Sequence, residues 1–335
     1  MAYSLQNRRY IGNKFKLLHF IDSVIEEEHL EFSCFADLFA GTGVVAEHLL
    51  SQGKVGIIND NLYSNYVFYQ AWLSNGKFDQ NKIEKILSYY NQATDFISDN
   101  YFSDNFSGTY YSYEDAKQIG SIREHLETMR EDLTVREYYI ILASLLYTAD
   151  KIANTVGHFE AFLAHAPVTR GVKLQILNLN RYKATPKIYN EDANILATKV
   201  SADLVYLDPP YNARQYANFY HLLENLAEWK KLPVAGKTLK MPRKNKMSKY
   251  STANATATLE QLVNSLQTRY VLLSYNNTYT ANSGASINKI AEEDILYMLK
   301  KVGTVKRFDT SYRFFNSGKT DFKNHRELLY LCKLK

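Results

Sequence analysis

The stretch FSCFADLFAGTGVVAEHLLSQGKVGIIND, residues 32–60, determines the predicted fold. FSCFADLFA is apolar enough for a buried strand, and it is followed by the tight turn Gly41-Thr42-Gly43 and by an apolar helix. Gly53 suits the end of that helix, because glycine adopts the left-handed conformation of a C-cap. KVGIIND is a second apolar run. A strand, a helix and a strand at this spacing are typical of a βαβ unit with parallel strands.

The remaining pattern extends this α/β unit and interrupts it once. Between about residues 76 and 165 only helical periodicity is found, which predicts an inserted helical domain. The α/β pattern resumes near Lys187 and includes the apolar run that ends at Asp208. The predicted helices are 13–28, 62–74, 80–100, 114–129, 135–156, 219–229, 258–269 and 287–303, with an aromatic loop at 101–113 and further strands at 203–207, 270–275 and 325–334.

Composition limits the class of protein. The chain has 335 residues, 46% of them hydrophobic, which is enough for a large α/β domain and a smaller second one. No apolar run is long enough for a membrane span, and the N-terminus lacks the apolar core of a secretory signal. The two cysteines, Cys34 and Cys332, form neither a disulfide framework nor a metal motif. We therefore expect a reduced, cytoplasmic protein without a metal site or a membrane.

Positive charge is concentrated in two segments. The segment 229–259 carries eight Lys and Arg residues and no acid, and the segment 166–190 carries five and no acid before Glu191. Such clusters are typical of a polyanion-binding surface, although a solvated surface remains an alternative for 229–259. The loop 230–255 is predicted to contact such a polyanion.

The glycine turn and the acid after the second strand indicate a nucleotide-like cofactor. Gly41 and Gly43 let a ligand approach the backbone at the start of a helix. Asp60 follows about 20 residues later, where a carboxylate can bind a ribose diol. This pattern alone does not distinguish NAD, FAD and S-adenosylmethionine, and Asp60 could instead cap the helix beginning near Leu62.

The most specific motif is Asp208-Pro209-Pro210-Tyr211, at the end of a buried strand. The Asp208 carboxylate and the Pro209 carbonyl are acceptors that can hold one exocyclic amino group and direct its lone pair. Tyr211 can stack on the ring that bears this group. A stacked base cannot enter such a pocket, so the substrate would be a base turned out of the duplex. The alternative is a strand terminator without a ligand.

Together with Phe39-x-Gly41-x-Gly43 and Arg9-Tyr10-Ile11-Gly12-Asn13-Lys14, this motif resembles the Dam-like, alpha-group DNA adenine-N6 methyltransferases, and in particular methylases of type II restriction–modification systems. The resemblance covers essentially the whole chain. It implies a Rossmann-like class I S-adenosylmethionine-dependent methyltransferase sheet with an inserted, mainly helical target-recognition domain. The catalytic domain would comprise 1–75 and 187–335, and the inserted domain 76–186. One departure is Asn13, which stands where a second glycine is common.

The resemblance also implies roles for residues. Asp208, Pro209 and Tyr211 would be catalytic. The expected S-adenosylmethionine contacts are Tyr10, Lys14, Asp37, Phe39, Gly41, Gly43, Asp60 and Asp192, with Glu191 as an alternative to Asp192. The residues predicted to contact DNA, from their charge and position, are Arg170, Arg181, Arg214, Arg243, Lys244 and Lys246, with Asn178 and Asn180 as further candidate base readers.

The predicted activity is site-specific transfer of a methyl group to N6 of adenine in double-stranded DNA, by a monomer or dimer with a possible cognate restriction endonuclease. Four alternatives remain at this point. They are an RNA adenine-N6 methyltransferase, a cytosine-N4 methyltransferase, a catalytically silent DNA-binding subunit, and a nicotinamide dehydrogenase that rests only on the glycine turn and Asp60.

Overall fold

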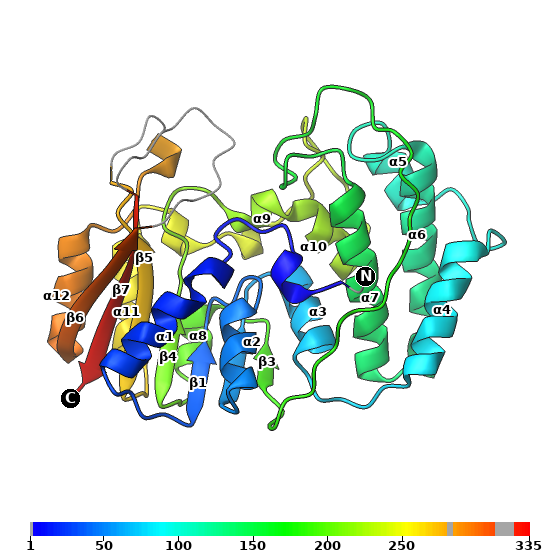
Figure 1. Ribbon diagram of the computed structural model, residues 1–335. Coiled ribbons are helices and arrows are strands. Elements are labelled where there is room, and N and C mark those ends of the chain that lie inside the picture. The colour runs from blue at the N-terminus through cyan, green and yellow to red at the C-terminus, as the bar shows by residue number, and fades with distance from the viewer. Residues whose placement is uncertain (1–2, 280–283, 312–324) are drawn as a thin grey trace. The chain divides into compact units, whose positions relative to one another are not determined.

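The computed structural model describes residues 3–279, 284–311 and 325–335 (Figure 1). The chain forms two compact units, each built from separate segments. The helical unit comprises Met1–Gly12, Leu62–Tyr182 and Ala217–Asn245, and the sheet unit comprises Asn13–Asn61, Lys183–Tyr216 and Lys246–Lys335. The helical unit therefore contains more of the chain than the predicted insertion 76–186, because segments on both sides of it belong to the same packed unit.

The sheet unit is built on seven strands in the order β3-β2-β1-β4-β5-β7-β6. The strands are β1 Cys34–Asp37, β2 Val55–Asn59, β3 Lys187–Tyr189, β4 Leu204–Leu207, β5 Tyr270–Asn276, β6 Gly303–Ser311 and β7 Arg326–Leu334. The first five in this order are parallel, whereas β7 runs antiparallel to both β5 and β6. The chain order reverses between β1 and β4, which makes this pair the topological switch point of the sheet. The Rossmann-like α/β fold predicted from the sequence is confirmed.

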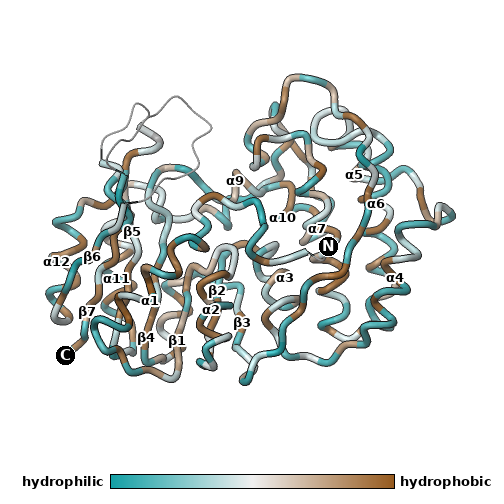
Figure 2. The backbone as a smooth tube through the Cα atoms, in the orientation of Figure 1, coloured by the Kyte–Doolittle hydropathy of each residue, from teal (hydrophilic) through white to brown (hydrophobic). Residues whose placement is uncertain are grey.

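Helices cover the sheet on both faces. On one face, α8 Ala193–Ala197, α11 Ala255–Ser265 and α12 Glu292–Val302 contribute to an apolar core with side chains from the strands. On the other face, Phe35 of β1 and Leu50 of α2 Val44–Ser51 approach Gly56 of β2 so closely that a Cβ there would lie 2.8 Å from the Phe35 ring. Figure 2 shows that the central strands β1 and β4 are predominantly apolar, as strands buried on both faces should be.

The helix α1, Leu18–Glu27, leads into β1. It is followed by Glu28, whose buried carboxylate pairs with Lys306 of β6 and Lys333 of β7. The helix is preceded by a short 3-10 turn, Phe15–Leu17, so the single helix predicted over 13–28 is divided in two. This 3-10 turn follows Lys14, whose backbone carbonyl accepts a hydrogen bond from the Leu17 amide.

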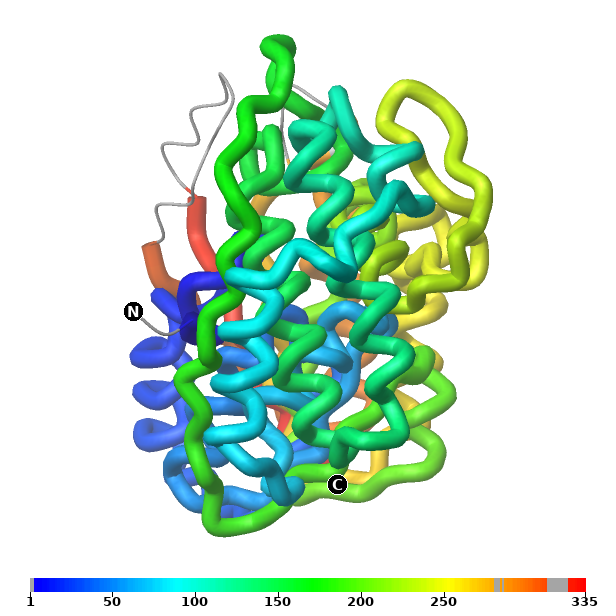
Figure 3. The backbone as a smooth tube through the Cα atoms, turned by 90° about the vertical axis from the view of Figure 1, so that its right-hand side faces the viewer, coloured from blue at the N-terminus to red at the C-terminus, as the bar shows by residue number. Residues whose placement is uncertain are grey.

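The helical unit is organised around α7, Val135–Ile152, which is buried on nearly all sides. It packs against α3 Tyr63–Trp72, α4 Gln80–Gln92, α6 Tyr113–Thr128 and α10 His221–Glu228, and α5 Tyr101–Phe106 packs on α6. A reciprocal capping box between Thr134 and Glu137 fixes the start of α7. An extended segment, residues 172–182, runs along the outside of the unit (Figure 3), held by hydrogen bonds from Asn91 of α4 and Ser144 of α7.

Two charged side chains join helix ends inside this unit. The Glu224 carboxylate of α10 accepts hydrogen bonds from the amides of Tyr63 and Ser64 at the start of α3. The buried Arg123 guanidinium of α6 donates to the carbonyls of Leu226 and Ala227 at the end of α10. A negative charge at a helix N-terminus and a positive charge at a helix C-terminus both interact favourably with the helix dipole. None of the helices within the described ranges is both long and apolar enough to cross a membrane.

Two predictions about local structure were wrong. The aromatic loop 101–113 contains the helix α5, whose capping box uses Asn100 and Ser103 instead of the usual Glu at the third helical position. The strand β6 was missed, because it is an edge strand in which every residue after Gly303 is half-buried or exposed, so it carries little apolar signal. Three predicted helices are shorter than expected. The helix predicted over 80–100 ends at Gln92, the helix predicted over 135–156 ends at Ile152, and the helix predicted over 287–303 begins at Glu292.

Candidate active site

The glycine turn lies at the carboxyl end of β1. Gly41 and Gly43 have φ angles of 54° and 84°, in the left-handed region that favours glycine. Gly43 is the N-cap of α2. The Gly41 amide donates a hydrogen bond of 2.9 Å to Oδ2 of Asp60, which is almost fully buried. Asp60 therefore fixes the conformation of the turn in addition to any ligand that it contacts.

Two asparagines that were not predicted as site residues hold the strand ends together. The Asn59 side chain donates to the carbonyls of Leu38 and Glu191 and accepts from the Glu191 amide. The Asn190 side chain donates to the Asp60 carbonyl at 2.7 Å. The ends of β1, β2 and β3 are thereby joined by amide groups. Both asparagines could have been predicted from the sequence, because they lie in the runs IINDN and YNED at the ends of strands. Polar residues at these positions gather at one edge of a parallel sheet.

Asp37, the last residue of β1, is fully buried. Neither carboxylate oxygen has a hydrogen-bond partner of good geometry among the described residues. Burial raises the pKa of this carboxyl well above its usual value, and the charges of Asp208 and Asp60 raise it further, although the Phe39 amide acts in the opposite direction. Because an unpaired buried carboxylate is costly, this position is suited to a cationic ligand.

Asp208 follows β4, on the other side of the switch point from Asp37. Its carboxylate accepts a hydrogen bond from the Tyr211 hydroxyl and forms an ion pair with Lys14, whose Nζ lies 3.1 Å from Oδ1. Burial raises the pKa of Asp208, while Lys14 and the Tyr211 hydroxyl lower it and the Glu327 charge raises it. The catalytic acid predicted from the sequence is therefore already bound to an N–H and an O–H donor.

The Tyr211 side chain is held at both ends. Its hydroxyl also accepts from Lys14 Nζ at 2.8 Å and lies 3.1 Å from the Ser274 hydroxyl of β5. Its ring centroid lies 4.6 Å from that of Tyr275, with the rings tilted by 57°. The Tyr275 hydroxyl donates to the Tyr211 carbonyl. Ser274 and Tyr275 were not predicted as site residues, because the run YVLLSY was interpreted only as a buried strand.

A second aromatic pair stands beside the glycine turn. Phe39 meets Tyr250 edge to face, with ring centroids 5.1 Å apart, and the Tyr250 hydroxyl donates to Asn194 of α8. Asp192 is exposed and caps α8 through hydrogen bonds from the amides of Asn194 and Ile195. Glu191, the alternative to Asp192, forms an ion pair with Lys199.

The residues that follow the Asp208–Tyr211 motif are bound to the end of the basic loop. The Gln215 amide pairs with both backbone groups of Ser248, donating to its carbonyl and accepting from its amide. The Ser251 hydroxyl donates to the Arg214 carbonyl. Lys246 donates to the Asn61 carbonyl at 3.2 Å, next to Asp60. The segment 246–251 is therefore fixed to the loops that carry Asp60 and Asp208.

The other predicted residues are distributed over both units. Tyr10 belongs to the helical unit, where it stacks on Tyr220 with ring centroids 4.7 Å apart. Arg243 is half-buried and donates to Asn218 Oδ1 and to the Met241 carbonyl. Arg214 donates to the Ser286 hydroxyl. The side chains of Arg170, Arg181, Arg214 and Lys244 are exposed.

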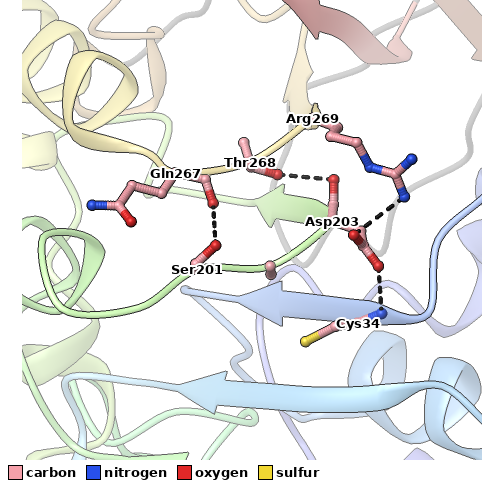
Figure 4. A pocket seen from close by; sticks show the side chains of 7 residues that line it. Cys34, Ser201, Asp203, Gln267, Thr268 and Arg269 are labelled. Carbon is pink, nitrogen blue, oxygen red and sulfur yellow. Dashed lines mark hydrogen bonds and ion pairs between the residues drawn. The ribbon is translucent and has the colours of Figure 1, made fainter.

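The opposite edge of the sheet has a hollow of a different kind (Figure 4). It is lined by residues at the start of β1, β4 and β5, among them Cys34, Asp203, Thr268 and Arg269. The Asp203 carboxylate accepts from the amides of Ser33 and Cys34, and Arg269 pairs with it at 3.2 Å. These polar groups satisfy each other, so this hollow holds strand ends in place.

Comparisons with known proteins identify the family of this chain. Residues 10–303 match the family of D12 class N6 adenine-specific DNA methyltransferases. The chain is 34% identical to the modification methylase StsI of Streptococcus sanguinis, over 98% of this chain and 52% of that protein. It is 31% identical to the type II methyltransferase M.NlaIII of Neisseria lactamica over 95% of each chain, and 32% identical to M.FokI of Planomicrobium okeanokoites over 92% of this chain and 50% of that protein.

The chain thus spans about half the length of StsI and M.FokI but nearly all of M.NlaIII. A match over most of the chain to one family excludes the nicotinamide dehydrogenase that the glycine turn had left open. The predicted resemblance is confirmed, and the chain belongs to the D12 class of N6 adenine-specific DNA methyltransferases.

Proposed function

We propose that this chain transfers a methyl group from S-adenosylmethionine to N6 of an adenine turned out of duplex DNA, as the modification enzyme of a restriction–modification system. The observation that carries the proposal is the pair of carboxylates at the switch point, Asp37 fully buried and Asp208 only 16% exposed. Asp37 lacks a hydrogen-bond partner of good geometry among the described residues, and Asp208 holds an ammonium group. Asp37 suits a cationic cofactor, and Asp208 suits an amine.

The residues beside Asp37 fit S-adenosylmethionine. This cofactor has a positive sulfonium and an ammonium group, and three acids, Asp37, Asp60 and Asp208, end neighbouring strands. Opposite charge favours the ionised carboxylate and would reverse the pKa increase that burial produces at Asp37. When bound, the cofactor supplies an activated methyl group. Gly41 and Gly43 would border it, and Asp60 would contact the ribose while keeping its bond to the Gly41 amide.

Asp208 and the Pro209 carbonyl fit the exocyclic amine of adenine. The amine has two N–H donors, and these two acceptors can engage both of them. Such bonds keep the nitrogen lone pair out of conjugation with the ring and direct it at the methyl carbon. The lone pair forms the new N–C bond, the C–S bond breaks with its electron pair left on sulfur, and one N6 proton leaves for the Asp208 carboxylate or for water. Alignment and electrostatics supply the catalysis.

Double-stranded DNA is the substrate that family membership implies, and the basic residues support its binding. Arg170, Arg181 and Lys244 are exposed and could contact phosphates or bases. Lys246 is bonded next to Asp60, and Arg243 to Asn218, so these two would act mainly by fixing the loop. We assign target recognition to the inserted helices, and we place the enzyme with its DNA in the cytoplasm. Because the relatives are type II methylases, a cognate endonuclease is part of this proposal.

The test is transfer of labelled methyl from S-adenosylmethionine to duplex DNA, followed by nucleoside analysis. We expect the label in N6-methyladenine, and no label with the Asp208→Ala variant. Glu28→Gln is the matched control, because it changes a buried, ion-paired carboxylate at the other edge of the same sheet. Label in cytosine, label in RNA only, or equal label with the Asp208→Ala protein would contradict the proposal.

A further inference from the structure

Lys14 is a buried ammonium group between two carboxylates. Its side chain is only 7% exposed. Its Nζ lies 3.1 Å from Asp208 Oδ1 and 4.0 Å from Glu327 Oε2, and it donates to the Tyr211 hydroxyl at 2.8 Å. In this state Lys14 occupies an acceptor that the adenine amine needs. Binding of adenine must therefore displace Lys14 from Asp208, at least in part.

Glu327 is the first carboxylate that a displaced Lys14 would meet. It lies near the start of β7, and its side chain is 8% exposed. Its Oε1 bonds to Nε2 of His325 at 3.2 Å, and this imidazole also approaches the Thr278 hydroxyl. Its Oε2 has no hydrogen-bond partner among the described residues. One oxygen is thus fixed, and the other faces Lys14 beyond hydrogen-bond distance.

We propose that Lys14 moves from Asp208 to Glu327 when the adenine amine binds, so that Glu327 is a positioning residue for methyl transfer. This inference rests on the proposed function, because it takes adenine N6 as the group that replaces Lys14. A shift of about 1 Å would bring Nζ within hydrogen-bond distance of Oε2. The ammonium would then keep a carboxylate partner, whereas a buried charge left without one is strongly unfavourable.

The same geometry explains why two acids are present where the reaction uses one. With Asp208 alone, Lys14 and the amine would compete for one carboxylate. Glu327 removes this competition without exposing the ammonium to water. The Lys14 charge stays within the site, close to Tyr211, so the electrostatic setting of Asp208 changes little during the exchange. His325 holds Glu327 by its other oxygen and leaves Oε2 directed at Lys14.

A double-mutant cycle separates this role from a purely structural one. Methyl transfer is measured at saturating S-adenosylmethionine for the wild type, Glu327→Gln, Lys14→Met and the double variant. Glu327→Gln removes the charge but keeps the shape of the side chain. We expect it to lower kcat by about 10-fold to 100-fold while Lys14 is present, because Lys14 then stays on Asp208. In the Lys14→Met background the same change should have little effect, because no ammonium needs a second partner.

The inference would be overturned if Glu327→Gln lowered kcat by the same factor with and without Lys14, or if it left kcat unchanged. If a wild-type protein active in methyl transfer gives either result, only the inference fails, whereas a wild type that does not methylate adenine would remove the proposed function as well. Should Glu327→Gln fail to fold, a structure of the wild type with duplex DNA and S-adenosylhomocysteine decides. Lys14 Nζ within 3.2 Å of Glu327 is expected, and Lys14 still bonded to Asp208 beside a bound adenine would refute the exchange.

Discussion

The strand β4 has an aspartate at each end, and the two carboxylates are in opposite situations. Asp203, before the strand, accepts from the amides of Ser33 and Cys34 at 2.8 and 3.0 Å, and these bonds lower its pKa despite some burial. Asp208, after the strand, is bound by side chains, and burial raises its pKa. Backbone amides cannot leave, whereas we propose that the Lys14 ammonium does. The difference separates an acid that holds the sheet from one that, in the proposed function, binds the substrate amine.

The largest effect is expected for Asp208→Asn. The amide keeps the size of the carboxylate but loses its charge and one acceptor, so kcat should fall by about 100-fold to 1000-fold, as for other preorganised electrostatic groups. Thermal stability should stay about the same, because the buried Lys14 ammonium keeps Glu327 as a carboxylate partner. Methyl transfer and a thermal melt of the same preparation test both parts. A large loss of stability would show that Asp208 is structural like Asp203.

Asp37→Asn is expected to have the next largest effect, and it is seen best as a function of pH. The folded protein raises the pKa of Asp37, so this group favours folding below its unfolded value, near 3.9, and this contribution is lost as pH rises toward the raised value. Above that window the Asn variant should therefore be the more stable protein. It should also bind S-adenosylmethionine about 10-fold or more weakly, because one opposite charge is lost.

Melting curves from about pH 2 to 8 and calorimetric titration with the cofactor test this prediction. For Asp203 the dependence of folding stability on pH has the opposite sign. Its lowered pKa gives stability above the unfolded value that is lost as pH falls through the folded value. Melting of an Asp203→Asn variant in the same series is the control, and it should converge with the wild type at low pH. Parallel curves for Asp37→Asn and the wild type would contradict the assignment of Asp37 as a buried cofactor acid.

The contrast between the two ends of β4 also shows what could be predicted from the sequence. The motifs gave Asp208, Tyr211, Lys14, Asp37 and Asp60, and the structure places all five in the sheet unit. The alternation of strands and helices was recognisable because buried parallel strands are continuous apolar runs. The strand β6 was not, since its exposed edge is polar. Likewise Asn100 and Ser103 cap α5 in a way that a search for Ser or Thr followed by Glu does not find.

Pairings across the fold were beyond sequence reasoning. Lys14 and Asp208 were both predicted, but with separate roles, and only folding shows that they form an ion pair. Glu327 lies in the apolar run HRELLYLCKL, where a single acid gives no signal. Its proximity to Lys14 depends on the antiparallel insertion of β7 beside β5, which pairs Glu327 with Asn276. Sequence patterns report which side chains face inward, and the register of distant strands decides which of them meet.

Asp203→Ala tests the structural end of β4, with a moderate effect on stability. The change leaves the amides of Ser33 and Cys34 without their acceptor, which should cost about 1–2 kcal/mol, as for the loss of a helix cap or a charged hydrogen bond. Methyl transfer at a temperature well below the melting transition should be unchanged. Denaturant unfolding gives the stability, and the methylation assay gives the activity. An activity loss larger than the fraction unfolded would assign Asp203 a role in the reaction.

The smallest effect is expected for Lys244→Ala, which extends the comparison to basic residues. Lys244 is exposed and makes no ion pair with the residues that the structure describes, whereas Lys301 of α12 pairs with Glu260. If Lys244 contacts a phosphate, its loss should reduce the slope of log K against log salt by about 0.9 and weaken DNA binding a few-fold, with no change in stability. Fluorescence anisotropy at several salt concentrations measures this slope. Lys301→Ala is the matched control, because the Lys301 charge is already paired with Glu260. An equal slope for the two variants would show that Lys244 does not contact a DNA phosphate.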